Sequence, residues 1–208
     1  FSMELAKEMN KIGVDGLLLV TPYYNKTSQK GLVESFSAIA DCTDSPVIVY
    51  NVPSRTTVNI LPETYCELAK HPHIVGVKEA NHDVSSVAKT ISLCGDSLTI
   101  YSGEDDQVLP IMALGGKGVI SVFSNVMPKE MHELCAALLR EDYRTARAMT
   151  SKYIKLMNTL FMDVNPIPVK EALSKMGYCS NKCRLPLTDM TTANKEKLTT
   201  VMQEYSLI

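Results

Sequence analysis

The sequence predicts an α/β protein built on a parallel sheet of the (β/α)8 TIM-barrel type. The barrel is incomplete, with about five strands present, and a C-terminal all-helical extension follows it. Three observations lead to this prediction. Short apolar segments alternate with helical segments along the first 128 residues. Polar and aromatic residues cluster where those apolar segments end, as barrel enzymes require. After Pro128 the strand pattern stops and helical periodicity continues alone.

Each expected element follows from its local pattern. The first helix, residues 2–12, has apolar residues at helical spacing and ends at Gly13, a residue type that commonly closes helices. Apolar runs predict strands at 16–20, 47–50, 74–78, 98–101 and 118–122. Helical segments are expected between them at 31–43, 62–70 and 84–94, with a short one ending at Leu114. Further helices are expected at 129–140, 143–161, 168–176 and 192–206. Residues 1–128 are therefore interpreted as the C-terminal part of a barrel, and residues 129–208 as a helical region.

A doubly wound open sheet would also alternate strands with helices, but such sheets usually carry a glycine-rich first turn that binds a nucleotide. No G-x-G-x-x-G is present. The G-G-K-G at 115–118 lies before a strand, at the end of the sheet opposite to a barrel's active site. We interpret it as a helix cap and a tight turn. The chain also begins within a helical pattern at Phe1, which predicts a fragment or a truncated form.

Composition bounds the possible partners. The chain has 208 residues, is 45% hydrophobic and carries a formal net charge of −2, which is ordinary for a globular protein. This charge gives no reason to expect nucleic acid or a membrane surface, and no apolar run is long enough to cross a bilayer. Six scattered cysteines are typical of thiols in a reducing compartment, so we expect a cytoplasmic protein. Cys179 and Cys183 lack a second ligand pair at zinc-finger spacing, and no metal is expected.

The segment I-V-G-V-K-E-A at 74–80 indicates the chemistry. Apolar residues run directly into Lys78, the pattern of a buried strand that ends with a cation in a protected space. Burial disfavours the charged amine and lowers its pKa, so the amine can attack a carbonyl and form a Schiff base. Side-chain alternation predicts Ile74 on the same face as Lys78, with Val75 on the other. The alternative is a strand-end lysine that extends to water or pairs with a carboxylate.

Residues at the ends of neighbouring strands extend this candidate site. Tyr50 ends the strand before that of Lys78, where a phenol could move protons, although core packing explains such a tyrosine equally well. Arg55 follows in a Pro-containing loop, and its guanidinium has the geometry to bind a carboxylate. The alternative is a loop arginine that faces water. Gly103 has no side chain, so the main chain at this position could approach a ligand closely. The alternative is a glycine that only forms a turn. The acids at 104–106 are expected to complement a helix N-terminus. The four histidines share no metal-binding spacing and are expected at the surface or in loops: His71, His73, His82 and His132.

Six motifs in matching order resemble the dihydrodipicolinate synthase family over essentially the whole chain. They are V-T-P-Y-Y-N at 20–25, Y-N-V-P-S-R-T at 50–56, V-K-E-A at 77–80, S-G-E-D at 102–105, G-G-K-G-V-I-S-V at 115–122 and N-P-I-P-V-K at 165–170. N-acetylneuraminate lyase and the keto-deoxy sugar-acid aldolases share the tyrosine and the lysine, but P-S-R at 53–55 favours the synthases. The resemblance implies a pyruvate-dependent Schiff-base lyase of lysine (diaminopimelate) biosynthesis, with no cofactor beyond its own lysine.

The resemblance also implies roles for individual residues. Lys78 would form the Schiff base with pyruvate, and Tyr50 would be the central proton relay. Tyr24 would reach across a dimer interface into the relay of a second subunit. Members of the family are usually homotetramers built from tight dimers, so a homo-oligomer is expected here.

Four further residues correspond to family positions. Arg55 would receive the carboxylate of L-aspartate 4-semialdehyde, Gly103 and Ile120 would surround pyruvate with main-chain groups, and Tyr23 matches a residue of a lysine feedback pocket. One motif departs from the family: G-T-T-G-E, whose threonines bind the pyruvate carboxylate, is absent. Two alternatives therefore stay open. One is a truncated, catalytically incomplete paralogue or fragment, and the other is a related pyruvate aldolase that acts on a sugar acid.

Overall fold

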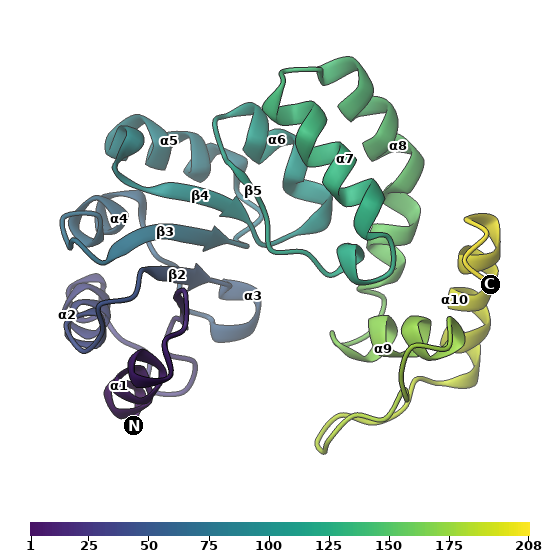
Figure 1. Cartoon of the computed structure of the whole chain (residues 1–208), viewed down its shortest axis with the longest axis horizontal. Helices are drawn as coiled ribbons and strands as arrows, with labels where there is room; N and C mark the ends of the chain where they lie inside the picture. Colours follow the sequence, from purple (N-terminus) through teal and green to yellow (C-terminus); the bar gives the residue numbers. More distant parts are fainter. The chain divides into compact units, whose positions relative to one another are not determined.

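The computed structural model describes all residues from Phe1 to Ile208, and the chain divides into two units, Phe1–Ile120 and Ser121–Ile208. The first unit contains one sheet with its strands in the order β1-β2-β3-β4-β5 (Figure 1). The strands are β1 (Leu17–Val20), β2 (Val47–Asn51), β3 (Ile74–Glu79), β4 (Thr99–Ser102) and β5 (Gly118–Val119). Every neighbouring pair is parallel, which confirms the predicted sheet. Five strands fall short of the eight that close a barrel, so the barrel is incomplete.

Helices precede and connect the strands of the first unit. They are α1 (Ser2–Ile12), α2 (Gln29–Ala40), α3 (Pro53–Thr56), α4 (Pro62–Leu68), α5 (Val84–Cys94) and α6 (Val108–Ala113), with single 3-10 turns η1 (Gly95–Ser97) and η2 (Asp105–Gln107). Side chains of Ser28 and Asp83 accept a backbone N–H at the starts of α2 and α5, at 3.2 and 3.1 Å. Gly13 ends α1 in the left-handed conformation, at φ 82°, which costs a glycine little. Local capping chemistry therefore sets these boundaries.

The core of the first unit lies between the sheet and α2, α4 and α5, which stand in a row beside the strands (Figure 1). Val49 on β2 and Val77 on β3 are fully buried in it, together with Phe36 on α2 and Leu68 on α4. Along β2 the buried residues alternate with half-buried ones. The alternation of side chains thus assigns the half-buried residues to the face that these helices do not cover.

A bulge in β3 changes one predicted feature. The pairing with β2 shifts by one residue between Ile74 and Gly76, which makes Val75 an extra residue in the strand. Ile74 is buried in the same core cluster as Val77, and Val75 is 41% exposed. The prediction that Ile74 shares the face of Lys78 is therefore wrong, because regular alternation toward the end of the strand begins only after the bulge.

The second unit is helical, as predicted. It contains η3 (Phe123–Asn125), α7 (Pro128–Leu139), α8 (Tyr143–Thr159), α9 (Ile167–Lys175) and α10 (Thr192–Glu204). Helix α8 packs against α7 and α10, and α9 packs against α10. One leucine from each of three helices is buried there: Leu134, Leu156 and Leu198. No helix of the chain combines the length and the hydrophobicity that crossing a membrane requires.

Candidate active site

Lys78 and Tyr50 lie beside each other on adjacent strands, and we call them the amine–phenol pair. They are register partners between β3 and β2. The Nζ atom of Lys78 lies 4.1 Å from the centroid of the Tyr50 ring, a cation–π distance at which the ring attracts the charged amine. Both side chains are half-buried on the face opposite to the core helices. The parallel register therefore brings a nitrogen base and a phenol together at one end of the sheet.

Burial shifts the pKa of both members of the pair. It lowers the pKa of Lys78; Glu104 and then Asp105 oppose this shift, while Arg55 adds to it. Burial raises the pKa of Tyr50, Glu104 raises it further, and Arg55 lowers it. A lowered pKa enlarges the neutral fraction of an amine near pH 7, and the neutral amine is the nucleophile. Burial of the Lys78 amine therefore favours the neutral form, which is the form that can attack a carbonyl.

Arg55 lies on α3, a one-turn helix, and not in the irregular loop that the sequence predicts. Pro53 occupies the first turn of this helix, where its fixed φ and missing N–H are tolerated. Thr21, just after β1, donates its hydroxyl to Thr56 Oγ1 at 2.8 Å, and both side chains are buried. This hydroxyl pair fastens α3 to the end of β1. The short helix holds Arg55 close enough to lower the pKa of both members of the amine–phenol pair.

Gly103 and Ile120 take part in backbone hydrogen bonds beyond the ends of β4 and β5. The Gly103 N–H donates to the Glu79 carbonyl at 2.7 Å, and the Ile120 N–H donates to the Ser102 carbonyl at 2.9 Å. A Cβ at Gly103 would lie only 2.7 Å from the Ala80 Cβ, so a side chain has no room there. These contacts extend the ladder of the sheet past its last strand residues, and they hold the chain ends of three strands together.

Tyr23 and Tyr24 are the predicted site residues that the structure does not bring to the amine–phenol pair. They follow β1 and are 73% and 91% exposed. Rings this exposed pack against little of their own chain.

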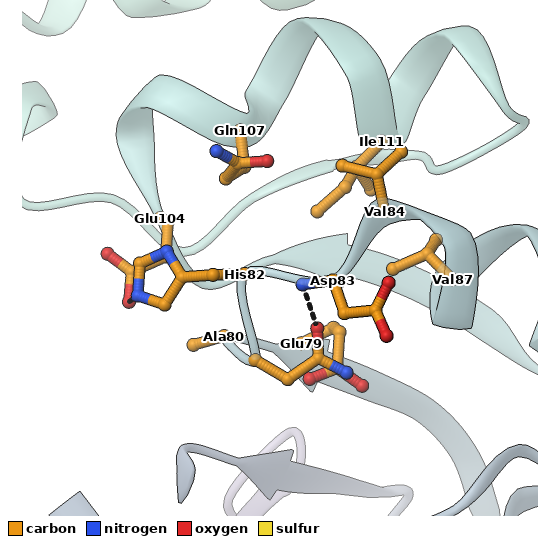
Figure 2. Close-up of a pocket in the computed structure, with 10 residues that line it drawn as sticks. Glu79, Ala80, His82, Asp83, Val84, Val87, Glu104, Gln107 and Ile111 are labelled. Atoms are coloured by element: carbon orange, nitrogen blue, oxygen red, sulfur yellow. Dashed lines mark hydrogen bonds and ion pairs between the residues drawn. The ribbon is translucent and has the colours of Figure 1, made fainter. Parts of the chain in front are cut away.

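Glu104 and His82 form a pair that the sequence did not reveal. The Nε2 atom of His82 lies 3.6 Å from Glu104 Oε1, and the glutamate side chain is only 16% exposed. Figure 2 shows the imidazole beside this carboxylate at the rim of a small pocket, which Asn81 and Gln107 also line. Burial raises the pKa of Glu104, and His82 opposes that shift. His82 has a φ of 59°, a left-handed conformation that is uncommon for residues other than glycine. The one signal in the sequence is that Glu104 directly follows Gly103 at a strand end.

Glu79 is a buried carboxyl group on the face opposite to Lys78. Tyr65 on α4 donates its hydroxyl to Glu79 Oε2 at 2.7 Å, and Asn51 Nδ2 on β2 donates to Oε1 at 2.9 Å. The side chain is 4% exposed, and burial raises its pKa to about 7 against the opposing effect of these hydrogen bonds. Glu79 therefore links β2, β3 and α4 directly behind the candidate site.

The fold and the site together define an enzyme of the (β/α) barrel type, with the Lys78 amine at the carboxyl end of a strand, where such enzymes carry their active sites. Comparison with known proteins gives the family. The chain belongs to the dihydrodipicolinate synthetase family, whose model matches residues 2–205. The members of this family are lyases.

The relatives are similar over the whole of this chain. The 4-hydroxy-tetrahydrodipicolinate synthase of Geobacter sulfurreducens is 49% identical over 207 residues, which cover 100% of this chain and 71% of that protein. The crystal structure of dihydrodipicolinate synthase from Aquifex aeolicus is 43% identical with a TM-score of 0.96, over 99% of this chain and 70% of that one. The chloride-inhibited dihydrodipicolinate synthase from Acinetobacter baumannii, complexed with pyruvate, is 41% identical with a TM-score of 0.96, over 99% of this chain and 71% of that one.

Proposed function

We propose that this protein condenses pyruvate with L-aspartate 4-semialdehyde, through a Schiff base on Lys78, to give 4-hydroxy-tetrahydrodipicolinate in lysine biosynthesis. The observation that carries the proposal is the half-buried Lys78 amine above the Tyr50 ring, with its pKa lowered by burial. The relatives support the choice of substrates, because one is named for this product and another was crystallised with pyruvate.

The proposed chemistry begins with the neutral Lys78 amine attacking the keto carbon of pyruvate. Loss of water from the carbinolamine gives an imine, and loss of a proton from the methyl carbon gives an enamine. The enamine carbon then attacks the aldehyde carbon of the semialdehyde, whose oxygen takes up a proton and becomes a hydroxyl group. The amino group of the semialdehyde attacks the imine carbon and displaces the Lys78 amine, which closes the ring and frees the protein. Tyr50 is proposed to carry the protons of these steps, because its phenol ring lies against the amine.

The remaining residues are proposed to bind and orient the substrates. Both substrates carry carboxylates, and the guanidinium of Arg55 matches a carboxylate in a two-pronged geometry. Main-chain groups at Gly103 and Ile120 are proposed to border the pyruvate. Tyr24, 91% exposed in a single chain, is proposed to contact a second copy in a cytoplasmic homo-oligomer, and Tyr23 to serve lysine feedback.

Reduction with borohydride in the presence of pyruvate tests the proposal. The imine should be trapped as one stable adduct on the peptide that contains Lys78, as peptide mass spectrometry would detect. The Lys78→Arg variant keeps the positive charge but cannot form the imine, so it should give no adduct. The Lys89→Arg variant removes an exposed lysine elsewhere in the unit and should behave like the wild type. No adduct, or an adduct on another lysine, would refute the proposed role of Lys78.

The acceptor requires a separate test. Arg55→Ala should raise KM for L-aspartate 4-semialdehyde roughly 10- to 100-fold, the usual effect of losing a hydrogen bond to a charged group. Trapping of pyruvate should change much less. Efficient turnover of a sugar aldehyde that is indifferent to Arg55→Ala would favour the sugar-acid aldolase instead.

A further inference from the structure

Two thiols from neighbouring helices lie in contact on the helical side of the sheet. Cys66 is in α4, and Cys94 is the last residue of α5. Their Sγ atoms are 3.0 Å apart, and both side chains are partly exposed. Helices α4 and α5 pack along each other, so the contact is part of a continuous interface (Figure 1). A disulfide bond is about 2.05 Å long, so closing the gap requires a movement of about 1 Å.

The environment of the pair acts on the Cys94 thiol. Burial and the adjacent Cys66 sulfur raise the pKa of the Cys94 thiol to about 12. Burial therefore disfavours the thiolate of Cys94, and either sulfur can donate its proton to the other across the contact. The thiolate is the form that oxidants attack, and a second thiol in contact is what converts a first oxidation into a disulfide.

We propose that Cys66 and Cys94 form an oxidation site that closes to a reversible disulfide in the presence of a peroxide. The Cys66 thiolate attacks one peroxide oxygen, the O–O bond breaks, and the products are a sulfenic acid and, after protonation, water. The Cys94 sulfur then attacks the sulfenic sulfur, its proton leaves with the departing hydroxide, and a second water forms. In total, two thiols lose two electrons and two protons to hydrogen peroxide, which is reduced to two waters.

The disulfide would enclose the strand that carries the candidate nucleophile. The loop between Cys66 and Cys94 contains all of β3, including Lys78. A covalent link between α4 and α5 restricts the unfolded chain and should therefore make this part of the protein harder to unfold. The proposal does not depend on the proposed reaction, because it requires only the two thiols and the oxidant.

The test is oxidation of the whole chain with hydrogen peroxide under native conditions, followed by alkylation and peptide mapping. Cys66 and Cys94 should lose their reactive thiols together, one for one, and a peptide joined through these two residues should appear. Dithiothreitol should restore both thiols. The oxidised protein should also show a higher midpoint of thermal unfolding than the reduced protein.

Single substitutions sharpen the test. Cys66→Ser and Cys94→Ser should each abolish the crosslinked peptide, whereas Cys42→Ser and Cys179→Ser, at cysteines outside the pair, should leave it intact. The peptide map of the oxidised wild-type protein tests the proposal even if a variant folds poorly. Oxidation of either cysteine to sulfinic acid without a crosslink, or a disulfide between other partners or between chains, would overturn the proposal.

Discussion

Replacing Glu79 with glutamine should remove a pH dependence of stability that the wild-type protein has. The carboxyl is 4% exposed, and its pKa rises from 4.5 to about 7 on folding. The folded state therefore binds more protons than the unfolded state over this range, and stability must fall as the pH rises through it. Since one pKa unit corresponds to about 1.36 kcal/mol, the ionised form costs the folded protein about 3 kcal/mol at high pH. Between about pH 5 and pH 7, the free energy of unfolding should fall by about 2 kcal/mol of this total.

Glutamine is neutral throughout this range and keeps one oxygen that can accept the Tyr65 hydroxyl. Its amide nitrogen would face Asn51 Nδ2, which is also a donor and is held in place because Asn51 Oδ1 accepts the Ile60 N–H. This mismatch should cost about 1–3 kcal/mol, but by the same amount at every pH. The Glu79→Gln variant should thus be less stable than the wild type at pH 5. Its free energy of unfolding should fall less than that of the wild type between pH 5 and pH 8.

Urea unfolding at pH 5, 6, 7 and 8 measures the effect as the slope of the free energy of unfolding against pH. The wild type should lose about 2 kcal/mol more than Glu79→Gln between about pH 5 and pH 7. Glu196→Gln, at an exposed glutamate of α10, is the control and should keep the wild-type slope. Equal slopes for the wild type and Glu79→Gln would refute the reasoning, because the buried carboxyl would then not titrate with a raised pKa.

Three further changes have directions that the structure determines. Glu104→Gln removes a carboxylate that raises the pKa of Lys78, so the midpoint of borohydride trapping against pH should move lower, while Asp96→Asn on the exposed η1 should leave it in place. An unchanged or higher midpoint would contradict the electrostatic role of Glu104. Gly103→Ala puts a methyl group 2.7 Å from a neighbouring alanine Cβ and should lower the free energy of unfolding by about 1–3 kcal/mol, measured in urea. Phe36→Ala empties a core position that is 2% exposed and should cost about 3–5 kcal/mol in the same assay, and a loss under 1 kcal/mol would be inconsistent with the described core.

The sheet was predictable because its signals are local and repeated. Each strand is a short apolar run, and a helical segment lies between successive strands, as a crossover between parallel neighbours requires. The proximity of Tyr50 and Lys78 also follows from sequence, because successive parallel strands end at the same edge of the sheet. The apolar runs and the order of the strands are sufficient for both inferences.

Features that depend on one inserted residue or on one turn were not predictable. The bulge at Val75 reverses the face of Ile74, yet both residues are apolar and read as an uninterrupted strand. The helix that holds Arg55 is a single turn, too short to show a period. His82 adopts a left-handed conformation that the sequence does not predict, and its imidazole lies 3.6 Å from the Glu104 carboxylate. Each of these depends on contacts between segments that are distant in sequence.

The neighbouring residues Lys78 and Glu79 place a half-buried amine and a buried carboxyl on opposite faces at the end of β3. Side chains alternate at this point, so the carboxyl cannot pair with the amine next to it and neutralise its reactivity. The carboxyl instead accepts hydrogen bonds from α4 and β2 on the opposite face. Its partner on β2, Asn51, follows Tyr50, so the contact that fixes Asn51 opposite Glu79 also fixes Tyr50 opposite Lys78. One buried hydrogen-bonded carboxyl therefore stabilises the register on which the amine–phenol pair depends, without taking part in its chemistry.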